Sequence, residues 1–150
     1  MSQFLSDAER NIASAQNNTS ALQRLARATV PHLADFCLIF RVRGNDVRCV
    51  ASAHTTPEGQ RLLRGLTRVY KITRNDPIST VAHVLRTGRP KLRTAIFNEP
   101  AAPVTDLRVF TLHQRLGARS ALVVPIGSPP DVLGAISLSY ANSGRQSSPV

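Results

Sequence analysis

The apolar and polar positions near the end of the chain predict two β-strands joined by a turn. Residues 122–126 and 132–140 are rich in β-branched and aliphatic side chains, and the segment between them contains Gly127, Asp131 and two prolines, which favour a turn. Along the second strand, large apolar side chains alternate with small ones: Ile136, Leu138 and Tyr140 with Ala135, Ser137 and Ser139. We therefore expect an antiparallel hairpin whose small face leaves room for a closely packed helix or a ligand.

A second hairpin is predicted over residues 35–54, because two strand-like runs flank a Gly-Asn pair at 44–45 that suits a two-residue turn. If Arg43 lies opposite Asp46, one face of this hairpin is wholly apolar. Its cross-strand pairs are then Val42 with Val47, Phe40 with Cys49, Leu38 with Ala51, and Phe36 with Ala53. The other face carries Cys37, Ile39 and Val50, with Arg41 and Arg48 opposed near the turn. A slip of one residue would place Arg48 in the core, so the pattern favours this register.

Apolar residues at helical spacing predict helices before the first hairpin and through the middle of the chain. The predicted segments are helices at 7–30, 57–68, 78–86 and 104–116, a short strand at 91–95 and a loop at 98–103. The first helix has a weak point or a new N-cap at 17–20, and we expect it to cover the face of Cys37. Asp76 and Pro77 are expected to begin the 78–86 helix and Gly88 to end it.

Together these elements predict an α+β domain built on a central antiparallel sheet of five to six strands, with helices on both faces. A length of 150 residues, 42% of them hydrophobic, fits one domain with its own core. The sequence has no run of eighteen apolar residues, and its start lacks the basic-then-apolar order of a secretory signal. We therefore expect a cytoplasmic location and no membrane span.

The charge balance raises the question of an anionic partner. Nineteen Lys and Arg against nine Asp and Glu give a formal net charge of +10, which is typical of proteins that bind nucleic acid or anionic membranes. The basic residues are nevertheless spread along the chain rather than gathered in one tail: Arg41, Arg43, Arg48, Arg61, Arg64, Arg68, Lys71, Arg74, Arg86, Arg89, Lys91 and Arg93. We expect a solvated basic surface that influences partner encounter, and we keep nucleic-acid or anionic-surface binding as a less favoured alternative.

Four sequence phrases occur in an order that resembles a GAF domain. They are VPHLADFCLIFRV at 30–42, VASAH at 50–54, VLRTGRP at 84–90, and LGARSALVVPI followed by VLGAISL from 116 to 138. The resemblance covers about 22–144 and is strongest to GAF modules that precede histidine kinases or serine phosphatases in bacterial signalling proteins. It implies a GAF/PAS-like sheet with a pocket between one sheet face and the middle helices.

The resemblance also implies a function: a sensory or regulatory module of bacterial signal transduction, such as a two-component system. Such a module binds a small molecule and relays the signal to a partner protein or output domain, with a homodimer among the implied assemblies. The candidate ligand-binding residues are Phe36, Leu38, His54, Val81, His83, Leu85, Phe97, Arg119, Ser120 and Leu122. The alternative is a ligand-free scaffold for protein interaction or dimerisation, and the sequence identifies no cofactor.

Several of these candidates have a second, structural interpretation. His54 could hydrogen-bond a ligand at the pocket rim or cap a loop, and His83 could enter the pocket from the middle helix. Arg119 could hold an anionic ligand or bond to the C-terminus of a helix above it. The apolar candidates, Phe36, Leu38, Phe97 and Leu122, could line a pocket or belong to the core.

The domain boundaries follow from the same comparison. Residues 1–21 are expected to form an N-terminal helical extension, 22–142 the GAF domain and 143–150 a disordered tail. GAF domains usually continue after the SGR phrase into a long helix, whereas here QSSPV follows Arg145. We therefore expect the usual C-terminal helix to be absent from this chain.

The sequence carries no recognisable catalytic or metal motif. In the predicted register Cys37 and Cys49 point to opposite sheet faces, so they can neither form a disulfide nor bind one metal ion. Neither cysteine precedes a histidine as in bilin-binding GAF domains, and the NK…F…DE motif of cyclic-nucleotide binders is missing. The histidines lack metal-ligand spacing, and Ser120 lacks a Gly-x-Ser-x-Gly elbow. We expect a non-enzymatic domain, with a small redox enzyme that uses the cysteines as the remaining alternative.

Overall fold

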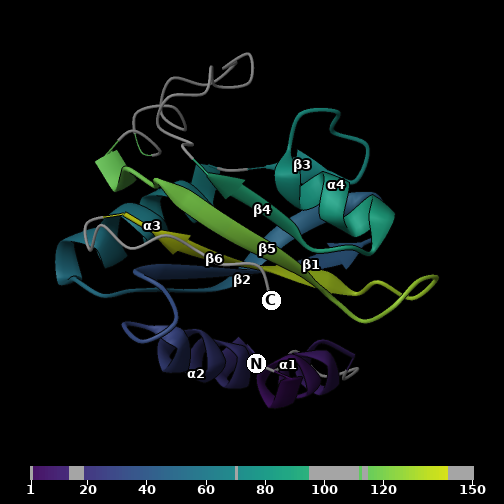
Figure 1. Ribbon diagram of the computed structural model, residues 1–150, viewed down its shortest axis with the longest axis horizontal. Helices are drawn as coiled ribbons and strands as arrows, with labels where there is room; N and C mark the ends of the chain where they lie inside the picture. Colours follow the sequence, from purple (N-terminus) through teal and green to yellow (C-terminus); the bar gives the residue numbers. More distant parts are fainter. Residues whose placement is uncertain (1, 14–18, 70, 95–111, 113–114, 142–150) are drawn as a thin grey trace.

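A six-stranded antiparallel sheet organises the chain, with the strand order β3-β2-β1-β6-β5-β4 (Figure 1). The computed structural model describes residues 2–13, 19–69, 71–94, 112 and 115–141. The strands are β1 (Phe36–Arg43), β2 (Asp46–His54), β3 (Ile72–Thr73), β4 (Lys91–Thr94), β5 (Ser120–Ile126) and β6 (Gly134–Tyr140). The predicted α+β class and antiparallel sheet are confirmed, and β3 is a short strand that the sequence pattern did not reveal.

Helices cover both faces of this sheet. Figure 1 shows α1 (Ser2–Ala13) and α2 (Thr19–Thr29) beneath one face, and α3 (Pro57–Val69) and α4 (Thr80–Thr87) on the other. The predicted 7–30 helix is therefore two helices that part near the expected weak point. Of the predicted 104–116 helix only Leu112, Arg115 and Leu116 are described, and each of them is helical. The predicted loop at 98–103 and tail at 143–150 lie outside the described residues.

The sheet separates two apolar cores. The upper core, between the sheet and α3 and α4, includes Phe36, Leu38, Phe40, Val47, Leu63, Leu66, Val81, Val84, Leu85 and Val123. The lower core, between the sheet and α1 and α2, includes Ala8, Ile12, Leu22, Ala26, Cys37, Ile39, Ala51, Ala53, Ile136 and Leu138. Because α1 contributes Ala8 and Ile12 to the lower core, it packs as part of this domain; the predicted boundary at residue 21 stays a prediction.

One β-bulge changes the predicted register of the first hairpin. Near the turn the predicted pairs are confirmed, from Arg43 opposite Asp46 to Phe40 opposite Cys49. The next partner of β1 is Ala51, opposite Ile39, so Val50 is an extra residue on β2. The predicted pairs Leu38–Ala51 and Phe36–Ala53 are therefore wrong. The observed pairs are Leu38 with Ser52 and Phe36 with His54.

The bulge also exchanges the faces of the last β2 residues. Beyond Val50, Ala51 and Ala53 face the lower core, whereas Ser52 and His54 lie beside β1 residues of the upper core. Alternation along a strand would have given the opposite assignment. The sequence pattern missed the bulge because the small residues that follow Val50 suit either face.

Two glutamines satisfy the outer edge of β2 beyond its short pairing with β3. Gln23 of α2 accepts a hydrogen bond from the Ser52 N–H at 3.1 Å and donates to the Ser52 carbonyl. Gln60 of α3 accepts from the His54 N–H at 2.9 Å. An exposed strand edge is a template for unwanted strand pairing, and side chains that occupy its donors and acceptors block that route. Helices of both layers are thereby tied to the same strand.

The start of α4 differs from the expected one. Its N-cap is Ser79, whose hydroxyl accepts a hydrogen bond from the Ala82 N–H at 3.2 Å. Asp76 accepts instead from the N–H groups of Ile78 and Ser79, at 2.9 and 3.0 Å, and forms the turn before the helix. The predicted helix end is confirmed, since Gly88 adopts the left-handed region at φ 67°.

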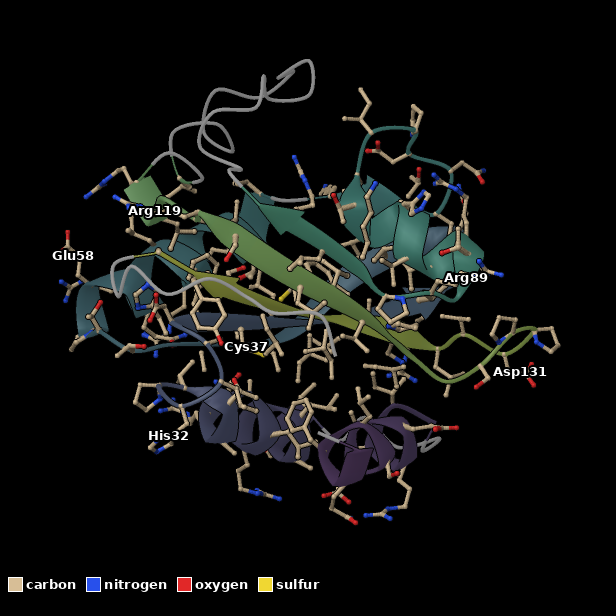
Figure 2. All side chains as sticks on the ribbon, in the orientation of Figure 1. His32, Cys37, Glu58, Arg89, Arg119 and Asp131 are labelled. Atoms are coloured by element: carbon tan, nitrogen blue, oxygen red, sulfur yellow. The ribbon has the colours of Figure 1, made fainter. Side chains whose placement is uncertain are left out.

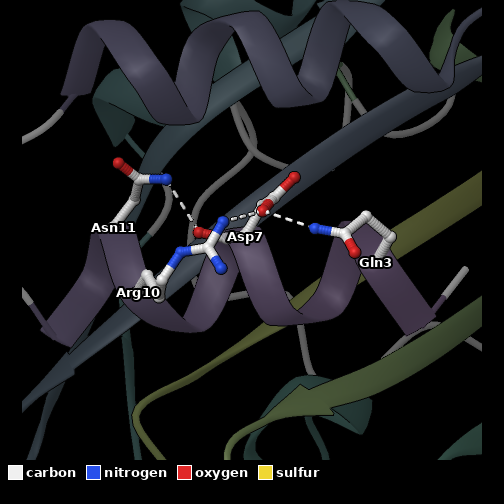
Figure 3. Close-up of polar contacts among 4 residues, drawn as sticks. All are labelled: Gln3, Asp7, Arg10 and Asn11. Carbon is white, nitrogen blue, oxygen red and sulfur yellow. Dashed lines mark hydrogen bonds and ion pairs between the residues drawn. The ribbon is translucent and has the colours of Figure 1, made fainter.

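The solvent-exposed side of α1 carries a polar cluster centred on Asp7 (Figure 3). The carboxylate accepts hydrogen bonds from Gln3, at 3.0 Å, and from Arg10, while the Asp7 carbonyl accepts from Asn11 at 2.7 Å. These partners lie three or four positions from Asp7, the spacing at which side chains meet on a helix. The cluster stabilises α1 locally and leaves Ala8 and Ile12 to face the sheet.

Two glycines give a stability test with opposite signs. A methyl group at Gly134 would overlap the carbonyl oxygen of Phe40 on the neighbouring strand, so Gly134→Ala should lower the free energy of unfolding by about 1–3 kcal/mol. At Gly65, inside α3, the described neighbour that a methyl group would meet is Leu112, at an ordinary 3.6 Å. Gly65→Ala should raise stability by up to about 1 kcal/mol, because alanine favours a helix interior. Urea unfolding of both variants checks the prediction, and a neutral Gly134→Ala would contradict the close approach of the strands.

Candidate functional site

The upper face of the sheet carries two cross-strand rows in which polar and apolar side chains lie together. Directly paired residues point to the same face of a sheet. One row runs across β2, β1, β6 and β5 as His54, Phe36, Ser139 and Ala121. The next row is Ser52, Leu38, Ser137 and Val123. We call these eight residues the upper floor.

The centre of the upper floor carries small side chains between larger neighbours. Ser137 and Ser139 are 7% and 4% exposed, and each lies next to a large residue of β1, Leu38 or Phe36. Each hydroxyl can donate and accept a hydrogen bond, so the two serines give the centre of the upper floor a polar character. The sequence indicated this small face of β6 in advance.

His54 is held at the end of the upper floor by three neighbours. Its ring stacks on Phe36, with ring centroids 5.4 Å apart and an interplanar angle of 7°. Its Nδ1 atom accepts a hydrogen bond from the Thr56 N–H at 3.0 Å, immediately before α3. On another side the ring contacts the backbone of Gly59, where a methyl group would overlap it. The ring therefore links the sheet to the first turn of α3.

The environment of His54 favours the neutral ring. Burial lowers the pKa of His54 below its ordinary 6.5, and the nearby Asp35 carboxylate opposes this shift only in part. Since Nδ1 accepts from Thr56, the proton of the neutral ring lies on Nε2, which can donate to a hydrogen-bond acceptor. His54 thus has both the loop-capping role that the sequence allowed and one remaining donor.

Asp35 connects the strand ends around His54. Its backbone N–H donates to Ser139 at 2.8 Å, and its carbonyl accepts from the N–H and the hydroxyl of Thr55, at 3.0 and 2.7 Å. The carboxylate accepts from the Ala141 N–H at 2.7 Å. Asp35 is 6% exposed, so these bonds join the start of β1 to the ends of β2 and β6 inside the protein. They fix the edge of the upper floor at which His54 lies.

The structure divides the predicted site residues among several environments. Phe36, Leu38, Val81 and Leu85 lie in the upper core, and His54 lies at its edge. Ser120 and Leu122 are paired with Tyr140 and Leu138 on the lower side of the sheet, so they do not face the same space. His83 and Arg119 are exposed, Arg119 at one end of the molecule (Figure 2), and Phe97 lies outside the described residues.

Sequence reasoning did not select Ser52, Ser137, Ser139 or Gly59 as site residues. The alternation along β6 was a sufficient signal for the two serines of that strand. No comparable signal existed for Ser52 or Gly59, because the bulge decides which way Ser52 points and tertiary packing brings Gly59 to His54.

The two cysteines lie on opposite sheet faces, as predicted, with Cys37 in the lower core (Figure 2) and Cys49 against the upper core. Burial raises the pKa of each thiol to about 12. Both are therefore protonated near neutral pH, whereas nucleophilic and metal-binding cysteines are thiolates. Within the described parts of the chain, no three His, Cys, Asp or Glu side chains gather as a metal site would require.

The lower side of the sheet has a shallow, open depression of about 400 Å³, lined by Thr19, Ser20, Gln23 and Val50. It lies between α2 and β2, away from the upper floor. Gln23 already bonds the backbone of β2 there. No described helix is long and apolar enough to cross a membrane.

Comparisons with known proteins agree on the fold. No family model matches the chain, and no curated protein matches it. Most of the similar solved structures are GAF domains. The nlh2 GAF domain of A. aeolicus, in an inactive state, is 13% identical at a TM-score of 0.61 and covers 93% of this chain and 78% of its own. The GAF domain/HD domain protein of Geobacter sulfurreducens is 19% identical at 0.61 and covers 96% and 81%.

An enzyme is also among the similar structures. The type II free methionine-R-sulfoxide reductase of Thermoplasma acidophilum is 10% identical at a TM-score of 0.53 and covers 81% of this chain and 73% of its own. This chain has a GAF-like fold. The same fold occurs in GAF domains and in a reductase, so the fold alone does not define a function.

The pH dependence of stability tests the environment of His54. As pH falls through 6.5, the unfolded chain protonates at His54 before the folded chain does, because burial lowers the pKa only in the folded state. The stability of the wild type relative to His54→Gln should therefore be constant at alkaline pH and should decrease as pH falls below 6.5. Urea unfolding across this pH range measures the difference. A difference that is independent of pH would show that the ring titrates as if it were in water.

Proposed function

We propose that this chain is a sensory or regulatory domain that binds a small molecule against the upper floor and relays the bound state to a partner or output domain. The observation that carries the proposal is that His54, Ser137 and Ser139 share the upper floor with the apolar side chains of Phe36 and Leu38. Few polar groups converging on an apolar surface are typical of ligand sites.

The chemistry of the upper floor supports a compact ligand with both apolar surface and hydrogen-bonding groups. Phe36 and Leu38 offer apolar contacts, and the hydroxyls can donate or accept. The eight residues of the upper floor carry no full charge when His54 is neutral, which favours an uncharged ligand or one whose charge lies outside the floor.

The relay part of the proposal rests on α3. A ligand that displaces the His54 ring would act on its bond to the Thr56 N–H and on its contact with Gly59, both at the first turn of α3. A ligand shifts α3 from one position to another only if it binds the protein more tightly when the helix is in the second position. The bacterial signalling context, a two-component output and a homodimer stay predictions from the sequence resemblance. The cytoplasmic location stays a prediction from the apolar pattern of the sequence.

A redox enzyme is the less supported function. The high pKa of both thiols and their separation by the sheet argue against a reductase that uses Cys37 and Cys49. Replacement of both cysteines by serine, followed by a methionine sulfoxide reduction assay, would decide this alternative directly.

Ligand binding can be tested with a thermal-shift screen of metabolites followed by titration calorimetry of each hit. For a ligand of the upper floor, His54→Ala should weaken binding about 3- to 10-fold, the usual effect of one lost hydrogen bond. His83→Ala is the matched control, because His83 lies exposed on α4 and should leave the affinity unchanged. Ser139→Leu should abolish binding by filling the floor.

Equal effects of the two histidine substitutions would place the ligand elsewhere. If no compound raises the melting temperature, the scaffold function becomes the better account of the fold.

A further inference from the structure

The outer side of α3 and the segment after it form an uninterrupted basic run. Between Glu58 and Asp76 the sequence contains five cations and no acid: Arg61, Arg64, Arg68, Lys71 and Arg74. The first four of these side chains are exposed. The run therefore presents its charge to solvent rather than to the core.

Three of these cations lie in one line along α3. Arg61, Arg64 and Arg68 are separated by three and four positions, the spacing that places side chains above one another on a helix. The line extends about 10 Å at a rise of 1.5 Å per residue. Leu63 and Leu66 face the upper core from the same helix. We call these three residues the arginine line.

Nothing in the described part of the chain neutralises the arginine line. The ion pairs described there join Arg10 to Asp7 and Arg115 to Glu58, the latter at 3.7 Å, and neither includes the line. Like charges three or four positions apart on a helix repel one another and lower its stability. An anionic partner would remove this repulsion and gain charge-assisted hydrogen bonds.

We propose that the arginine line docks an acidic helix of a partner protein. A helix with carboxylates at i, i+3 and i+7 presents them in a line of the same length, and the planar guanidinium group binds a carboxylate through two parallel bonds. A second copy of this chain does not fit, because none of the described helices carries such a line of acids. The proposal concerns the outside of α3 and does not depend on a ligand at the upper floor.

A nucleic acid fits this surface less well. The arginine line is a single row on a convex helix and not a groove that could follow a phosphate backbone. Single-stranded nucleic acid is usually bound with the help of exposed aromatic side chains, and no described aromatic side chain falls in the exposed class. An acidic helix needs neither a groove nor aromatic side chains to pair with a single row of guanidinium groups.

The test uses fluorescence anisotropy with two labelled peptides of one composition. The first is a helical peptide with glutamates at i, i+3 and i+7, and the second is its scrambled form. The patterned peptide should bind the wild type more tightly than the scrambled one. The variant Arg61→Ala/Arg64→Ala/Arg68→Ala should lose about tenfold in affinity for the patterned peptide, the sum of three modest ion pairs.

The control variant Arg24→Ala/Arg27→Ala/Arg89→Ala removes the same charge from exposed positions on α2 and after α4. It should keep the affinity within about twofold, well short of the loss from three pairs. Thermal unfolding should show the arginine-line variant at least as stable as the wild type, because like charges have been removed. Equal losses in the two triple variants, or equal binding of the two peptides, would overturn the proposal. Tighter binding of duplex DNA through the same arginines would replace it with nucleic-acid recognition.

Discussion

The extra residue at Val50 in β2 is the constraint on which the candidate site depends. Without it, Ala53 would lie beside Phe36, and alternation would carry the His54 ring to the lower side of the sheet. With the extra residue, Ser52 pairs with Leu38 and His54 pairs with Phe36, so both side chains face the upper core. A single unpaired residue therefore changes a wholly apolar strand end into a polar border of the upper core.

Helix α3 connects the upper floor with the arginine line. Its first turn is bonded to the sheet through Thr56 and Gln60, while its outer side carries the arginine line. Movement of the His54 ring would reach the helix at the end nearest Glu58. The GAF-like fold leaves the function open, since similar structures include both GAF domains and a reductase.

Several features of the fold could be predicted from the sequence. The two hairpins and the helix end at Gly88 follow from alternation and from a residue that tolerates positive φ. The start of α4 was misplaced because Asp76 and Ser79 are both good capping residues and local sequence does not rank them. Ser120 and Leu122 were predicted to bind the same ligand as Phe36 and Leu38. Alternation along β5 instead places their side chains on the sheet face that Val123 does not share.

The order of residues was enough for the antiparallel sheet, its helical cover and the excess of arginine, because these depend on short-range periodicity and on composition. Packing alone decided where β2 bulges, which serines meet Phe36 and Leu38, and that Gly59 approaches His54. Those contacts join segments distant in the chain, and their energies compare whole arrangements of the core rather than neighbouring residues. The site is consequently a property of the folded sheet.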